Sequence, residues 1–200
     1  MGPTARGGDG IPPHDSPANT LHLTDSATTV GARQCTHATP RSGISTVVVV
    51  ALAGSPIRWL DDWQSSADVE AERATFVVDD TASWTAGDPA VRLAVESWPA
   101  TDVSVRTVSS TGNLTDMGVT LTDVLETHDA ESTLLCFQSL TVLLQYAPLE
   151  EVYQFLHTLV SHVDRTEITA HFHLHADAHD DDTVATLRPL FDRVRRDAER

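Results

Sequence analysis

From Ile44 onward the chain alternates between short apolar runs and stretches with helical spacing. The apolar runs are rich in β-branched residues, which favour strands. They predict five strands, at Thr46–Ala53, Thr75–Val78, Val103–Val108, Thr133–Phe137 and Ile168–Leu174. The run Thr46–Ala53 is apolar on both faces, which is typical of a central strand in a parallel sheet.

The clearest helical pattern runs from Pro148 to Val163. Its apolar residues recur three and four positions apart and form one stripe, made of Val152, Phe155, Leu156, Leu159, Val160 and Val163. Pro148 suits the first helical position, and the acids that follow it favour a helix N-terminus. Further helices are expected at Ile57–Ser65, Pro89–Ser97, Leu121–Thr127 and from Thr183 onward. Strands separated by single helices predict a three-layer α/β domain with a mostly parallel sheet.

Residues 1–42 have a different composition. They hold five of the ten glycines and five of the ten prolines, and their acidic and basic residues balance. So little apolar material does not offset the entropy of ordering a chain. We therefore expect a disordered, low-complexity tail over residues 1–42 and an α/β domain over residues 43–200.

The charge of the chain is unusual in size and in kind. The formal net charge is −16, and the basic residues are all arginine. Such a surface repels phosphate backbones and anionic lipids, so we expect no nucleic-acid partner and no membrane partner. At about 1 M salt the Debye length is roughly 3 Å, which lets carboxylates crowd a surface. The composition therefore predicts a soluble cytoplasmic protein adapted to concentrated salt.

The sequence does not predict a disulfide between the two cysteines. Cys35 falls in the predicted tail and Cys136 in a predicted core strand. We interpret Cys136 as a small buried apolar residue.

Parallel α/β sheets bind ligands beyond the carboxyl ends of their strands, so the loop Ala53–Trp59 after the first predicted strand is a candidate ligand site. A phosphate-binding P-loop needs two glycines, a lysine and a hydroxyl residue at fixed positions. This loop has one glycine and no lysine, and Pro56 lacks an amide hydrogen. Arg58 is the one cation that could meet an anion there. We expect no triphosphate site in this loop.

The strand Leu134–Phe137 leads into Gln138, Ser139 and Thr141. This pattern is close to the strand with which RecA-like ATPases present the carboxylate that orients Mg²⁺, except that Gln138 stands at the acidic position. A neutral amide does not supply the anionic ligand that a hard cation prefers.

Residues from about Ser45 to Val194 resemble the RecA-like core of the KaiC and RadA type, and more closely a group of small halophilic-archaeal domains derived from it. The resemblance rests on Leu134–Thr141 with the helix Leu149–Val163, on Ala170–Leu174, on His179–Asp181 with Thr183–Asp192, and on Val105–Thr122. It implies a degenerate RecA-like fold that has lost ATP hydrolysis. Because RecA-like domains associate through the faces beside the old nucleotide crevice, it also implies a homo-oligomer or a protein partner.

The segment from His171 to Asp182 is rich in histidine. On a strand His171, His173 and His175 point to one face, and His179 with Asp180 could complete a metal shell. The alternative is purely structural. The histidines are then partly buried polar residues at a strand end, and the acids after His179 cap a helix that begins near Thr183.

Two smaller features receive structural interpretations. Trp59 and Trp63, four positions apart, are expected to pin a helix to the sheet. The run Arg188–Arg200 has oppositely charged residues four positions apart and is expected to continue the last helix as a solvated surface.

We assign no catalytic, cofactor-binding or metal-ligating residue. The expected function is a non-catalytic regulatory or scaffold domain that acts through protein contacts. The alternatives are a metal-binding protein or metal-dependent hydrolase that uses His171, His173, His175 and His179, and a binder of nucleotides or small anions that does not hydrolyse them.

Overall fold

The computed structural model describes residues 19–24, 35, 44–52, 56–66, 71–79, 102–138 and 140–197. Within them the chain forms one seven-stranded sheet with the order β4-β3-β2-β5-β6-β1-β7, and every neighbouring pair is parallel. The strands are β1 (Asn19–Thr24), β2 (Thr46–Val50), β3 (Arg73–Asp79), β4 (Asp102–Val108), β5 (Thr133–Phe137), β6 (Thr169–His175) and β7 (Arg193–Asp197). The predicted α/β class and its parallel sheet are confirmed.

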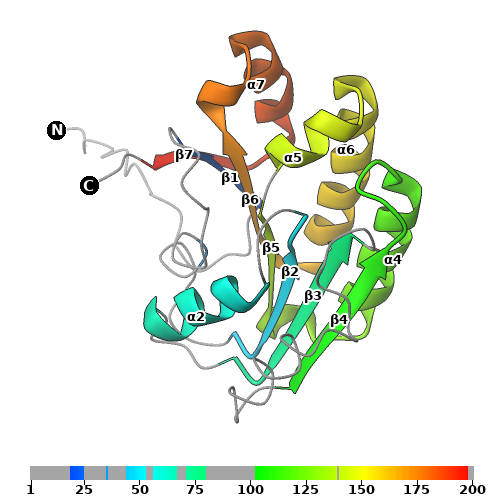
Figure 1. The fold of residues 1–200 in the computed structure, drawn as a ribbon, viewed down its shortest axis with the longest axis vertical. Helices are drawn as coiled ribbons and strands as arrows, with labels where there is room; N and C mark the ends of the chain where they lie inside the picture. Colours follow the sequence, from blue (N-terminus) through cyan, green and yellow to red (C-terminus); the bar gives the residue numbers. More distant parts are fainter. Residues whose placement is uncertain are drawn as a thin grey trace, which may run out of the picture.

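Helices lie on both faces of the sheet (Figure 1). The helix α2 (Pro56–Ser66) covers one face, where Trp59 and Trp63 pack on Val49 and Phe76. The other face carries α4 (Leu114–Glu126), α5 (Leu140–Tyr146), α6 (Leu149–Thr166) and α7 (Asp181–Leu187). Trp59 and Trp63 are each 2% exposed and stack on each other, so the prediction that they pin the helix to the sheet is confirmed.

The helix predicted from the apolar stripe is present as α6. Its acids Glu150 and Glu151 stand in the first turn, and Pro148 is the residue just before the helix. The helix predicted at Leu121–Thr127 begins earlier, because Asn113 caps α4 by accepting a hydrogen bond from the Asp116 amide at 3.1 Å. Helix α5, which no periodicity predicted, fills the short connection between β5 and α6.

Six residues of the predicted tail belong to the sheet. Asn19–Thr24 forms β1, which lies between β6 and β7 and is buried along its whole length. Leu21 and Leu23 reach the larger core, while the alternate residues face the α2 side. The prediction of a tail is wrong for this segment, because a composition averaged over 42 residues hides a strand of six. Apart from Cys35, the rest of residues 1–42 lies outside the described residues.

The charged segment that begins at Arg188 does not continue the last helix, although its charge spacing predicted that it would. Helix α7 ends at Leu187, a short 3-10 turn follows over Arg188–Leu190, and Arg193–Asp197 is strand β7. Pro189 interrupts the helix because its ring blocks the continuation of the backbone ladder, and Phe191 then packs into the core.

The predicted helix Pro89–Ser97 lies outside the described residues. None of the helices in the described ranges combines the length and the hydropathy needed to cross a membrane.

Candidate functional site

The α2 side of the sheet becomes polar where β1 and β6 pair. The parallel register places His22 of β1 opposite His173 of β6, and Cys136 of β5 opposite His171. Because side chains alternate along a strand, Phe172 and Leu174 point to the other face, where they enter the larger core. Three imidazoles from two adjacent strands therefore occupy one face of the sheet beside the sulfur of Cys136.

The imidazoles contact one another and are closed off from solvent. His22 stacks on His171 and on His173, with ring centroids 5.0 and 4.8 Å apart. A ring nitrogen of His22 (Nε2) lies 3.1 Å from Nδ1 of His171. The exposed fractions of His22, His171 and His173 are 1%, 2% and 0%.

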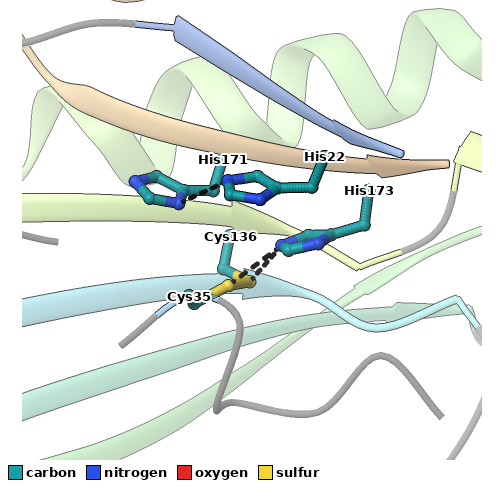
Figure 2. The surroundings of a disulfide bond; sticks show 5 residues. All are labelled: His22, Cys35, Cys136, His171 and His173. Carbon is teal, nitrogen blue, oxygen red and sulfur yellow. Dashed lines mark hydrogen bonds between the residues drawn. A yellow bond between two sulfur atoms is a disulfide. The ribbon is translucent and has the colours of Figure 1, made fainter. Parts of the chain in front are cut away.

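Cys35 and Cys136 form a disulfide bond at the end of this row of rings, as Figure 2 shows. Nε2 of His173 lies 3.2 Å from Sγ of Cys35 and 3.7 Å from Sγ of Cys136. Both sulfurs are fully buried. The expectation that the cysteines do not pair is wrong, because Cys35 is not part of a solvated tail but packs on the sheet over β5.

Burial sets the protonation state of the rings. Loss of solvent, together with the neighbouring His22 and Arg195, lowers the pKa of His171 to about 3. The same loss of solvent, with His22, His171 and His175 around it, holds the pKa of His173 well below its usual range. Both rings are therefore neutral near pH 7, and each has one nitrogen lone pair.

The other two histidines of the predicted metal set lie at the carboxyl end of the sheet. The hydroxyl of Thr141 accepts a hydrogen bond from the His175 amide at 2.9 Å and lies 3.2 Å from Nε2 of His179. Burial lowers the pKa of both His175 and His179. Asp180 caps α7 by accepting a hydrogen bond from the Thr183 amide at 2.7 Å, as the structural interpretation of this segment expected.

The four histidines do not gather into one group. Within the described residues, the donors compact enough to share a metal ion are Cys35, Cys136 and His173. His173 is thus the single member of the predicted set that belongs to the compact group. Sequence reasoning missed both sulfurs and His22, although the alternation Thr20-Leu21-His22-Leu23-Thr24 repeats the pattern of His171–His175.

The expected nucleotide crevice falls between β2 and β5. These strands are neighbours, yet β2 leads to α2 on one face and β5 leads to α5 and α6 on the other, so they form a topological switch point. Gln138 stands at the carboxyl end of β5, where its backbone N–H donates a hydrogen bond to the Val50 carbonyl at 3.0 Å. Residues 53–55 of the loop after β2 lie outside the described residues, and Arg58 is exposed on α2.

A carboxylate does occur at the carboxyl end of β3, but it is engaged in structure. Asp79 is 5% exposed, and its Oδ2 accepts hydrogen bonds from both the amide and the hydroxyl of Thr111. These bonds tie the end of β3 to the turn that precedes α4.

The fold and the buried histidine–cysteine cluster define a parallel α/β protein with a sulfur-containing cluster on the face of the sheet that α2 covers. No curated protein matches the sequence. Residues 17–195 match a family of unknown function, DUF7504, and the chain belongs to that family. The match begins just before β1, in agreement with the place of this strand in the sheet.

Proposed function

We propose that this chain is a non-catalytic regulatory or scaffold domain of the cytoplasm, built on a RecA-like core that has lost ATP hydrolysis. It acts by docking a segment of a partner protein. The observation that carries the proposal is a groove of about 740 Å³ between α4 and α6.

The groove combines an apolar floor with an exposed apolar side chain. Leu114 and Val119 of α4 face Phe155 and Leu159 of α6 along it. Val119 is 57% exposed, which is high for a valine on a helix that already packs on a core. A groove between two helices with apolar anchors at such spacing fits an amphipathic helix.

The polar rim of the groove indicates the charge of the partner. Three acids, Asp123, Glu126 and Glu151, line it against one arginine, Arg165. His162 also lines the groove, and its buried Nε2 has no hydrogen-bond partner within the described residues. A buried ring nitrogen without a partner is costly, and a donor or acceptor on a docked segment would satisfy it. We therefore propose a basic amphipathic helix as the docked segment.

The loss of hydrolysis is proposed from the sequence and from two positions in the sheet. The chain contains no lysine, so none of its loops supplies the lysine of a P-loop. Gln138 offers a neutral amide at the switch point, and the buried carboxylate of Asp79 binds Thr111. The acidic surface argues equally against nucleic acid as the partner.

A photo-crosslinking amino acid at position 119 tests the docking proposal in cells. We expect a discrete adduct with another protein from position 119 and none from Ala185, an exposed residue of α7 away from the groove. In the purified complex, Val119→Glu should abolish binding, whereas Ala185→Glu adds the same charge and should leave binding intact. The adduct is identified by mass spectrometry, and its cross-linked segment should be basic.

Other outcomes contradict the proposal in distinguishable ways. An adduct between two copies of this chain would make the groove a self-association surface. Adducts of equal yield from positions 119 and 185 would remove the groove as a specific site. Saturable ATP binding by calorimetry that Arg58→Ala weakens would favour a nucleotide binder instead.

A further inference from the structure

Two sulfur atoms and one imidazole nitrogen meet inside the protein, and each comes from a different segment. Cys136 lies on β5, His173 lies on β6, and Cys35 reaches them from outside the sheet (Figure 2). We propose that the reduced form of this chain binds one borderline-soft divalent cation, of which Zn²⁺ is the type, through Cys35 Sγ, Cys136 Sγ and His173 Nε2.

The donor set is the one that zinc selects in proteins. Thiolate sulfur at about 2.3 Å and imidazole nitrogen at about 2.0–2.1 Å are its usual ligands, arranged as a tetrahedron. Those bond lengths place a nitrogen and a sulfur of one site about 3.5 Å apart. The distances from His173 Nε2 to the two sulfurs, 3.2 and 3.7 Å, bracket that value.

The surroundings favour binding over simple packing. His173 is fully buried, one of its nitrogens faces the sulfurs, and the other, Nδ1, has no hydrogen-bond partner within the described residues. The two disulfide sulfurs carry no hydrogen, so neither can donate to a lone pair on Nε2. A metal bond to Nε2 uses that lone pair and leaves the ring proton on Nδ1.

The strands hold two of the three ligands in place before the ion arrives. Cys136 pairs with His171 in the sheet register, and His22 stacks on the ring of His173 at 4.8 Å. Only Cys35 must adjust when the bond between the sulfurs opens. Sites on strands keep their geometry better than sites on loops, so the arrangement is partly preorganised.

The change between the two forms is a balanced redox step. The disulfide accepts two electrons and two protons from an external dithiol, which becomes a disulfide itself, and Cys35 and Cys136 become thiols. The cation then displaces the two thiol protons and binds two thiolates and neutral His173. In the reverse direction an external disulfide accepts two electrons from the two thiolates and becomes a dithiol, the bond between Cys35 and Cys136 forms again, and the cation is released. In a reducing compartment a cysteine pair of this kind favours the metal form over the disulfide.

Cobalt is the probe for this site because its tetrahedral thiolate complexes absorb visible and near-ultraviolet light. The full-length protein is reduced with a phosphine, freed of metal with a chelator, exchanged into anaerobic buffer and titrated with Co²⁺. We expect thiolate-to-cobalt bands that saturate near one equivalent, and none in the oxidised protein. Zn²⁺ added afterwards should remove the bands, because zinc binds the same donors more tightly.

Variants separate this ligand set from the histidine set read from the sequence. Cys136→Ala and His173→Asn should lose the bands. His175→Asn, a matched change two positions along the same strand and away from the sulfurs, should keep them. Loss of binding in His175→Asn with retention in Cys136→Ala would overturn the proposal in favour of the all-histidine site.

A measurement on the unaltered protein guards against variants that do not fold. X-ray absorption at the zinc edge of the reduced, zinc-loaded chain should show two sulfur neighbours near 2.3 Å. A shell of nitrogen and oxygen alone, or no retained zinc after dialysis, would overturn the proposal. The outcome is independent of the groove, since Val119→Glu leaves these three ligands untouched.

Discussion

The disulfide between Cys35 and Cys136 should contribute a large share of the stability of the oxidised protein. The two cysteines are 101 positions apart in sequence, so the bond closes a long loop in the unfolded chain. Loop-closure entropy for that length corresponds to roughly 5 kcal/mol at 25 °C. The whole free energy of unfolding of a domain is only about 5–15 kcal/mol.

Chemical unfolding of the oxidised and reduced protein measures this contribution. Both samples contain a chelator, so that no metal ion stabilises the thiols, and unfolding in urea is followed by tryptophan fluorescence. Reduction should lower the urea midpoint by about 1.5–2.5 M if the slope is about 2–3 kcal/mol per molar. Trp59 and Trp63 report directly, because they pack in the same cluster as the disulfide.

The double variant C35A/C136A is the control for packing. It removes the cross-link together with both sulfurs, whereas chemical reduction removes the cross-link alone. We expect reduced wild type and the double variant to unfold within about 1–2 kcal/mol of each other, because two small side-chain deletions cost little beside the loop entropy. Equal midpoints for the oxidised and reduced wild type would refute the reasoning.

Three further predictions concern other parts of the molecule. The Gln138→Asp variant should release no phosphate from ATP, because one restored carboxylate does not supply the lysine that the chain lacks. Measurable ATP turnover by this variant would contradict the proposed loss of hydrolysis. Phe172→Ala should lower the free energy of unfolding by about 3–5 kcal/mol, because the ring is fully buried and stacks on Phe137 with centroids 5.9 Å apart; Phe172→Leu should cost clearly less. The hydrogen bonds from Thr183 lower the pKa of Asp180, so its support of α7 is complete above the ordinary aspartate pKa and is lost as the pH falls through the depressed value. Amide exchange at the start of α7 should follow that loss, and Asp180→Asn, which caps without titrating, should flatten it.

Much of the fold could be read from local patterns. The central strands β2 and β5 are continuous apolar runs, and the stripe on α6 repeats at helical spacing over about three turns. Each of these patterns is enough to identify its element without information from the rest of the chain. Strand β1 offers only Leu21 and Leu23 in a polar neighbourhood. Its burial comes from β6 and β7, which lie far away in sequence, and no window of the chain contains that information.

The candidate site could be predicted from the sequence only where its residues lie on one strand. The spacing of the histidines of β6 predicts a polar stripe, because side chains two positions apart on a strand lie on the same face. Their partners come from elsewhere: His22 lies 149 positions from His171, and Cys35 lies 138 positions from His173. Because a cluster is assembled by the strand order, its membership follows from the topology and not from the spacing of residues along the chain. The composition of residues 1–42 also led to a wrong prediction for Cys35, because the polar residues around it in the sequence are typical of a disordered tail.

The position of β1 has a consequence for how the chain is made. A ribosome delivers Asn19–Thr24 well before β6 and β7, the strands that flank it in the sheet. Strands β2, β3 and β4 are able to pair while translation continues, whereas β1 waits with its backbone groups unpaired until some 150 further residues have emerged. Contacts of such long range slow folding. Strand β1 therefore takes its place in the sheet only after β6 and β7, the two strands that flank it, have been made.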